Sequence, residues 1–124
     1  MKRKLRYKRL LLKVSGEVLG GIDTSIDFDR VGAFAVELKQ AVRTGCEVAV
    51  VIGGGNILRG YRASERGVER VAADSMGMLG TIINAIALQS ALERSGVEAQ
   101  VMTAIAMEQC AEPYIRRLAL EHRD

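Results

Sequence analysis

Short apolar runs alternate with longer helical patterns along this chain, and glycines stand at the junctions. This alternation is typical of βαβ units, in which parallel strands are joined by crossover helices. The run at 47–52 is almost continuously apolar, as expected for a strand covered on both faces. Similar runs predict strands at 8–15 and 98–103. We therefore expect an α/β fold with three layers, α/β/α, around a mainly parallel sheet.

Two helices are predicted between these strands. Apolar residues recur at helical spacing between the first two runs, and Gly45 stands where a glycine commonly ends a helix. A longer helix is predicted over 72–95, ended by Gly96. The apolar positions of the first helix are Val31, Phe34, Leu38, Ala41 and Val42, and those of the second are Met78, Ile82, Ile83, Ile86 and Leu92.

Two glycines lie inside the predicted long helix. Gly77 and Gly80 each cost up to roughly 1 kcal/mol there relative to alanine, so we expect another backbone, a ligand or a second subunit to approach closely. The neighbouring Met76, Met78 and Leu79 are more typical of a core or an interface than of a cofactor site.

A third helical pattern covers 112–123, beginning beside Pro113 and stopping with neither a glycine nor a following strand. Three parallel strands would leave a sheet edge without a neighbour, and such edges are normally paired or covered. The sequence therefore predicts an incomplete domain.

Composition excludes several classes of function. The net charge of +3 comes largely from the opening MKRKLRYKR, but aromatic residues are only 4% and no nucleic-acid motif is present. Lys13 interrupts the first apolar run, which argues against a secretory signal, and no stretch approaches the roughly 20 apolar residues of a membrane span. Cys46 and Cys110 are isolated, with His122 as the single histidine. We expect a cytoplasmic protein with no nucleic-acid partner, no membrane partner and no metal site.

The segment VVIGGGNILRG carries the strongest chemical signal. A strand runs directly into Gly53, Gly54 and Gly55 and then into a predicted helix. Such a place, beyond the carboxyl end of a parallel strand, suits phosphate, because glycines let backbone N–H groups approach an anion. Arg59 is spaced to bind phosphate oxygens as well. The alternative is a simple tight turn, since neither a Walker A motif nor G-x-G-x-x-G is present.

A second candidate anion site ends the first strand. Lys13 is followed by Val14, Ser15 and Gly16, and a lysine within an apolar strand is costly to bury unless it meets a negative group. The alternative is an edge strand with the ammonium group in water. Two phosphate loops at one end of a sheet would hold two phosphorylated ligands face to face, which suits phosphoryl transfer.

Four segments together resemble the bacterial UMP kinases of the amino-acid-kinase fold: KRLLLKVSGEVL, VVIGGGNILRG, RVAADSMGMLGTIINAIALQ and AEPYIRR. The resemblance covers nearly the whole chain. It implies transfer of a phosphoryl group from ATP, with Mg²⁺, to UMP in pyrimidine nucleotide biosynthesis.

The resemblance also implies roles for individual residues. Lys13 and Arg59 would be catalytic, and Asp74 would accept hydrogen bonds from UMP. From its position alone, Asp74 would instead complement the positive end of a helix. The ATP set is Lys13, Val14, Ser15, Gly16, Gly55 and Arg59, and the UMP set is Gly54, Arg59 and Asp74.

Relatives of this kind are about twice as long. The resemblance therefore implies that residues 1–124 are the N-terminal, UMP-binding part of a single domain, lacking the C-terminal, ATP-binding half and having little or no activity alone. It further implies a homo-oligomer, a hexamer in the family, with the long helix at a subunit contact. Residues 19–26 form a shorter loop than in relatives that respond to GTP, which puts GTP control in doubt.

Two alternatives stay open. One is a kinase of the same fold acting on a carboxylate or a carbamate, and preference for UMP as acceptor would separate the two. The other is a non-catalytic module that binds nucleotide and oligomerises.

Overall fold

The computed structural model describes residues 6–21, 24–57, 67, 69–103, 112–113 and 116–123. In chain order, its elements are β1 (Arg9–Val14), the 3₁₀ helix η1 (Gly16–Leu19), α1 (Phe28–Arg43), β2 (Glu47–Ile52), α3 (Arg70–Arg94), β3 (Met102–Thr103), β4 (Glu112–Pro113) and α4 (Arg116–Arg123). Strands and helices alternate from β1 to β3 as the sequence predicted, and the α/β class with parallel strands is confirmed.

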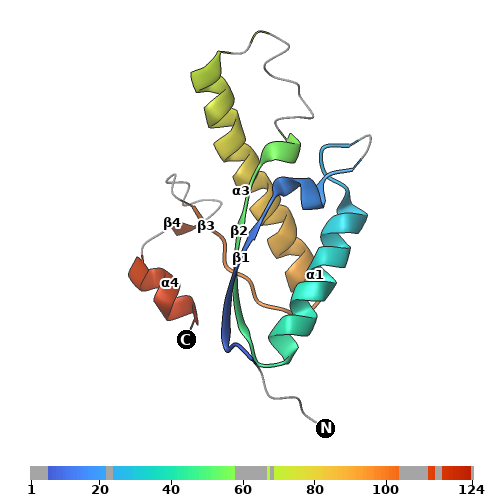
Figure 1. Ribbon diagram of the computed structural model, residues 1–124, viewed down its shortest axis with the longest axis vertical. Coiled ribbons are helices and arrows are strands. Elements are labelled where there is room, and N and C mark those ends of the chain that lie inside the picture. The colour runs from blue at the N-terminus through green and yellow to red at the C-terminus, as the bar shows by residue number, and fades with distance from the viewer. Residues whose placement is uncertain are drawn as a thin grey trace.

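β1 and β2 form a parallel pair in which Arg9 lies opposite Glu47 and Val14 lies opposite Ile52. Their carboxyl ends are therefore level, and the segments that follow the two strands start side by side (Figure 1). Alternate residues of β1 are half-buried and exposed. Lys13 is among the exposed residues, on the side of the strand away from the packed Leu12 and Val14.

The crossover helix α1 begins at an N-cap, Asp27, whose carboxylate accepts hydrogen bonds from the backbone N–H groups of Asp29 and Arg30. Such a cap satisfies donors that the first helical turn leaves unpaired. The helix ends before Gly45, which has the positive φ of 92° that glycine adopts readily. Both features agree with the predicted helix.

α3 ends as predicted, because Gly96 has a φ of 89°. Its buried face, however, differs from the predicted apolar face. Ile82 and Leu92 are buried, whereas Met78 and Ile83 are 50% and 47% exposed. Small and polar residues take part of the buried face instead, and its members are Gly80, Ile82, Asn84, Leu88, Ala91 and Leu92.

By length and composition alone, α3 could cross a membrane, with a mean hydropathy of 1.5. The sequence predicted no such span, because polar residues such as Asn84 are scattered among the apolar ones. A core helix of a folded domain meets the same criterion, and the described α3 packs one face against α1.

The predicted third strand and third helix need correction. Within the predicted strand at 98–103, only Met102–Thr103 form a ladder. They pair in parallel with Glu112–Pro113, in a two-stranded sheet separate from β1 and β2. The last helix starts at Arg116 rather than at 112. Proline disfavours helical backbone at the residue before it, which explains why Glu112 is extended.

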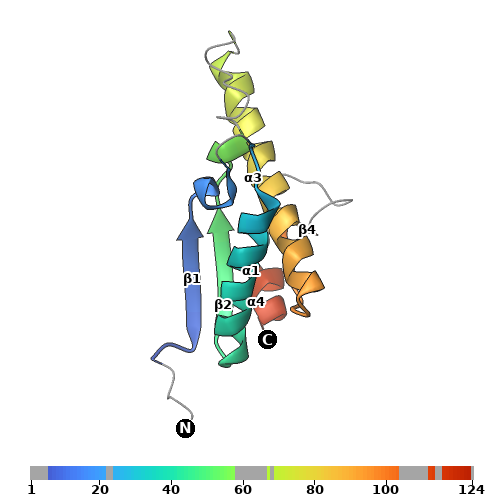
Figure 2. The same ribbon diagram turned by 90° about the vertical axis from the view of Figure 1, so that its right-hand side faces the viewer.

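The core lies between the β1–β2 sheet and the two long helices. Leu19, Val31 and Ala35 are fully or almost fully buried there, together with Leu88 of α3. Figures 1 and 2 show α1 and α3 beside the β1–β2 sheet, with the short α4 further along the chain near β4. Leu11 and Val51, on the side away from the core, are 72% and 53% exposed.

Candidate functional site

The two segments predicted to bind phosphate meet at the carboxyl ends of β1 and β2. The N–H of Gly53 donates to the carbonyl oxygen of Val14, at 3.1 Å. Gly16 lies so close to the second segment that a Cβ on it would stand 2.6 Å from the Gly53 carbonyl oxygen. The predicted juxtaposition of the two loops is therefore present in the structure.

The first loop turns directly into η1. Ser15 is the N-cap of this 3₁₀ helix, and its Oγ accepts a hydrogen bond from the N–H of Glu17 at 3.3 Å. Gly16 is buried beneath the turn, while the side chains of Lys13 and Ser15 are exposed. An exposed ammonium group and an exposed hydroxyl group beside a helix start can bind an anion without the cost of burying a charge.

The second loop starts a helical turn at residues 55–57, as the sequence predicted. The N–H of Ile57 donates to the Gly54 carbonyl at 3.1 Å. Gly55 is exposed, and a Cβ on it would stand 3.6 Å from the carboxylate of Glu17 in η1. Gly55 therefore faces the other loop, with its backbone accessible to a ligand.

Gly54 has a different environment, because its backbone packs directly against α3. A Cβ on Gly54 would lie 2.6 Å from both the Gly77 carbonyl oxygen and the Thr81 nitrogen. From the other side, a Cβ on Gly80 would lie 3.0 Å from the Cβ of Ile57. The close approach predicted at Gly77 and Gly80 is thus made by the glycine-rich turn of the same chain.

Asp74 lies on α3 about one helical turn before this contact. Residues three and seven positions apart share a helix face. Asp74 is therefore on the same face of α3 as Gly77 and Thr81, the face that packs against the glycine-rich turn. Its side chain is exposed. Asp74 is the fifth residue of α3, beyond a first turn that holds no acidic residue. Because the helix-end effect falls off within the first turn, this position favours ligand binding over helix-end electrostatics.

Arg59 lies outside the residues that the structure describes. Of the predicted set, the structure brings together Ser15, Gly16, Gly54 and Gly55, with Lys13 just before the first loop and Asp74 one turn away on α3.

Two asparagines that sequence reasoning missed lie directly under both loops. Asn56 and Asn84 are 5% and 0% exposed, and their amides are hydrogen-bonded to each other. Asn84 also donates to the Gly53 carbonyl oxygen at 2.7 Å. The available signal was an asparagine set in the apolar helix segment IINAIAL, together with one immediately after three glycines.

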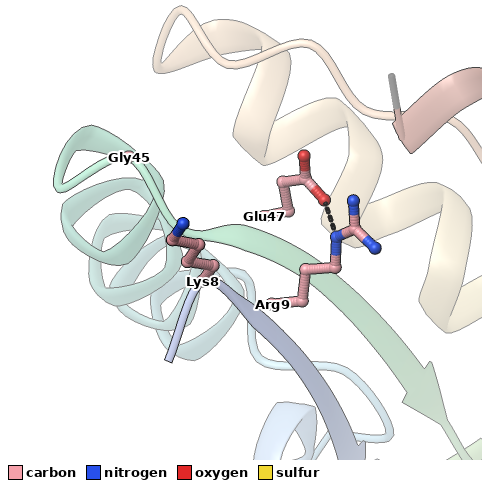
Figure 3. A pocket seen from close by; sticks show the side chains of 4 residues that line it. All are labelled: Lys8, Arg9, Gly45 and Glu47. Atoms are coloured by element: carbon pink, nitrogen blue, oxygen red, sulfur yellow. Dashed lines mark hydrogen bonds and ion pairs between the residues drawn. The ribbon is translucent and has the colours of Figure 1, made fainter. Parts of the chain in front are cut away.

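An open depression of about 500 Å³ lies at the opposite end of the sheet, lined by Lys8, Arg9, Gly45 and Glu47 (Figure 3). Its two charged residues from the paired strands bind each other, with 2.8 Å between Arg9 Nε and Glu47 Oε2. It is far along the strands from the glycine turns, so we assign the chemistry to the loop end. Within the described residues, no group of three or more His, Cys, Asp or Glu side chains could hold a metal ion.

Comparisons with known proteins all indicate the same family. The model of the Amino acid kinase family matches residues 8–122. A curated relative, the uridylate kinase of Nocardioides sp. (strain ATCC BAA-499 / JS614), is 51% identical over 118 residues, which are 95% of this chain and 50% of the relative.

Two solved structures are similar as well. The crystal structure of UMP kinase from Bacillus anthracis matches with a TM-score of 0.86 and 46% identity, over 95% of this chain and 49% of that one. UMP kinase from Ureaplasma parvum matches with a TM-score of 0.82 and 34% identity, over 96% and 54%. The chain thus spans about half the length of the relatives it matches.

Proposed function

This chain belongs to the amino acid kinase family, and we propose that it is the N-terminal, UMP-binding part of a UMP kinase, which transfers a phosphoryl group from ATP to UMP. The single observation that carries the proposal is the meeting of two glycine loops at the carboxyl ends of paired parallel strands. The likeness to uridylate kinases at 51% and 46% identity supports UMP as the acceptor.

ATP would be held by the first loop and by the exposed backbone of the second. Lys13, Val14, Ser15 and Gly16 would surround the phosphates, with Gly55 supplying an N–H group from the other side. In phosphoryl transfer, charge spreads over the equatorial oxygens of the transferring group, so catalysis is mainly positioning and charge neutralisation. We propose that Lys13 neutralises this charge, since its ammonium group is exposed at the strand end next to the loop.

UMP would lie along the N-terminal part of α3. Asp74 would accept hydrogen bonds from the nucleoside. Gly54, whose backbone packs against α3, would hold the glycine-rich turn next to the UMP. Arg59 would bind phosphates of both nucleotides through its forked guanidinium group. The exposed carboxylate of Asp74, on the helix face that approaches Gly54, supports this assignment.

We propose that residues 1–124 are part of a single domain whose second half supplies most of the ATP site. Donor and acceptor must be held together for in-line transfer, so we expect this chain alone to have little or no activity. Mg²⁺ would arrive with ATP, because this ion is usually bound through substrate phosphates and one or two carboxylates. The described residues offer no cluster of ligands for it.

We further propose a cytoplasmic homo-oligomer that uses the outer face of α3. Five apolar side chains on this helix are 36% to 78% exposed: Val71, Met78, Leu79, Ile83 and Ile86. Exposed apolar residues gathered on one element often mark a protein–protein contact. A non-catalytic module that binds nucleotide and oligomerises would share these features, and only turnover separates it from a kinase.

The test is UMP-dependent ADP formation. This chain alone and this chain fused to the C-terminal half of the Nocardioides relative would each be assayed with ATP, Mg²⁺ and UMP, beside CMP, a carboxylate acceptor and no acceptor. We expect turnover only from the fusion and only with UMP. Turnover by the chain alone would refute the half-domain assignment, and an inactive but folded fusion would favour the non-catalytic module.

In the same fusion, Lys13→Met should lower kcat by about 10²-fold or more, the scale on which one preorganised charge-stabilising donor acts. Lys8→Met is the matched control, because Lys8 is an exposed lysine just before the other end of β1. Equal effects of the two substitutions would remove Lys13 from the mechanism.

A further inference from the structure

The two phosphate loops rest on a buried pair of side-chain amides. Asn84 Nδ2 donates to Asn56 Oδ1 at 2.7 Å, and Asn56 Nδ2 donates back to Asn84 Oδ1 at 3.2 Å. Each amide has one further N–H, and each of these donates to a backbone carbonyl: Asn84 to Gly53 at 2.7 Å and Asn56 to Ser25 at 2.8 Å. All four N–H groups of the pair are therefore used.

The orientation of both amides follows from their outer partners. The carbonyl oxygens of Gly53 and Ser25 can only accept hydrogen bonds, so each asparagine must turn its NH₂ group toward one of them. The inner oxygens and N–H groups then match only in the reciprocal arrangement. A fully satisfied buried network of this kind is rigid and specifies one geometry.

This pair sets the distance between the loops. A Cβ on Gly16 would stand 2.5 Å from Asn56 Oδ1 and 3.0 Å from Asn84 Nδ2, so the first loop lies directly on the amides. The second loop is tied to them through the Gly53 carbonyl. Because Asn84 belongs to α3, the helix that carries Asp74 also fixes both loops.

We propose that Asn84, acting through Asn56, is a positioning residue for nucleotide binding: the amide pair holds the backbone of both loops in the spacing that binds phosphate. The inference rests on the proposed function. Burying two amides is costly unless they are satisfied, and an apolar residue at position 84 would fill the core without that cost. Its hydrogen bond to a glycine-loop carbonyl supplies the reason for an amide at this position.

The experiment compares Asn84→Ala with Leu88→Ala in the fusion of this chain to the C-terminal half of the Nocardioides relative, because that half supplies most of the proposed ATP site. Leu88 is 5% exposed on the same helix, one turn further on, and belongs to the apolar core rather than to the loops. Both variants lose stability, so a structural role alone predicts the same behaviour for both. Where Asn84→Ala does not fold, Asn84→Ser, which keeps a shorter hydroxyl group, takes its place.

Two readouts are taken well below each melting temperature. Hydrogen exchange is measured at the amides of Gly53 and Ile57, whose N–H groups are bonded to Val14 and Gly54, relative to amides in the middle of α3. ATP affinity is measured by calorimetry. We expect the Asn84 variant to exchange about tenfold faster at the two loop amides only. It should also bind ATP about tenfold more weakly or worse, since losing one hydrogen bond to a charged group weakens binding by about this factor.

The Leu88 variant should show neither change. Loop exchange that rises no more than exchange in α3, or an unchanged ATP affinity, would overturn the proposal. If the unsubstituted fusion binds neither ATP nor UMP, the proposed function fails. In that case loop exchange decides by itself whether the amide pair positions the loops.

Discussion

Replacing Gly54 by alanine should destabilise the chain, whereas the same change at the preceding glycine should not. The new methyl group at position 54 would lie 2.6 Å from the Gly77 carbonyl oxygen, 2.6 Å from the Thr81 nitrogen and 2.9 Å from the Gly80 carbonyl carbon. All three are backbone atoms of a helix, so no flexible side chain can move aside. At Gly53, the nearest atom is the Gly16 nitrogen at 3.7 Å, an ordinary contact.

The magnitude follows from two opposing terms. Overpacking a tight contact costs about 1 to 3 kcal/mol, and loss of glycine freedom in the unfolded chain returns roughly 0.4 to 1 kcal/mol. Gly54→Ala should therefore lower the free energy of unfolding by about 1 to 2 kcal/mol, and the melting temperature by roughly 3 to 10 °C for a domain of this size. Gly53→Ala should stay within about 0.5 kcal/mol of the unsubstituted chain.

The assay is urea and thermal unfolding of both variants, followed by circular dichroism. Equal losses at the two positions would refute the reasoning, because it depends on the contact between Gly54 and α3 and not on glycine content. A neutral Gly54→Ala would mean that the turn packs less closely on the helix than a Cβ distance of 2.6 Å requires.

Further predictions concern α1 and α3. Gly32→Ala should stabilise the chain by about 0.5 to 1 kcal/mol in urea unfolding, because Gly32 is inside α1 with nothing within 4 Å of a new Cβ; a loss of stability would contradict this. Gly96→Ala should cost roughly 1 kcal/mol, since its φ of 89° is unfavourable for alanine, and a neutral result would mean that α3 ends differently. Asp27→Ala should cost about 1 kcal/mol through loss of the α1 N-cap, which thermal unfolding beside Asp29→Ala would check.

Much of the fold could be predicted from local pattern. The strand at 47–52, the crossover helix and the glycines that end both long helices follow from hydrophobic period and backbone chemistry, and the structure confirms them. The predicted strand at 98–103 failed over most of its length, because ladder formation depends on a partner strand that the local pattern does not reveal.

The candidate site, too, was predicted where the signal is local and missed where it depends on residues far apart in the sequence. Sequence pattern identified both glycine loops, since their signal is a strand followed by residues with unusual backbone freedom. It did not identify Asn56 and Asn84, because a buried polar residue is recognised by its hydrogen-bond partners, and these lie up to 31 positions away in the sequence. It also predicted a close contact at Gly77 and Gly80 without showing that Gly54 makes it.

The central claim is that this chain carries a UMP site formed at the two loops and the start of α3. The most direct test is calorimetric titration of the 124-residue chain with UMP and with CMP, together with the Asp74→Ala variant. Asp29→Ala is the control, since it removes an exposed carboxylate from α1. The account predicts saturable binding of UMP that Asp74→Ala weakens about tenfold or more and Asp29→Ala leaves unchanged. Absence of UMP binding, or equal binding of UMP and CMP that is insensitive to Asp74, would contradict it.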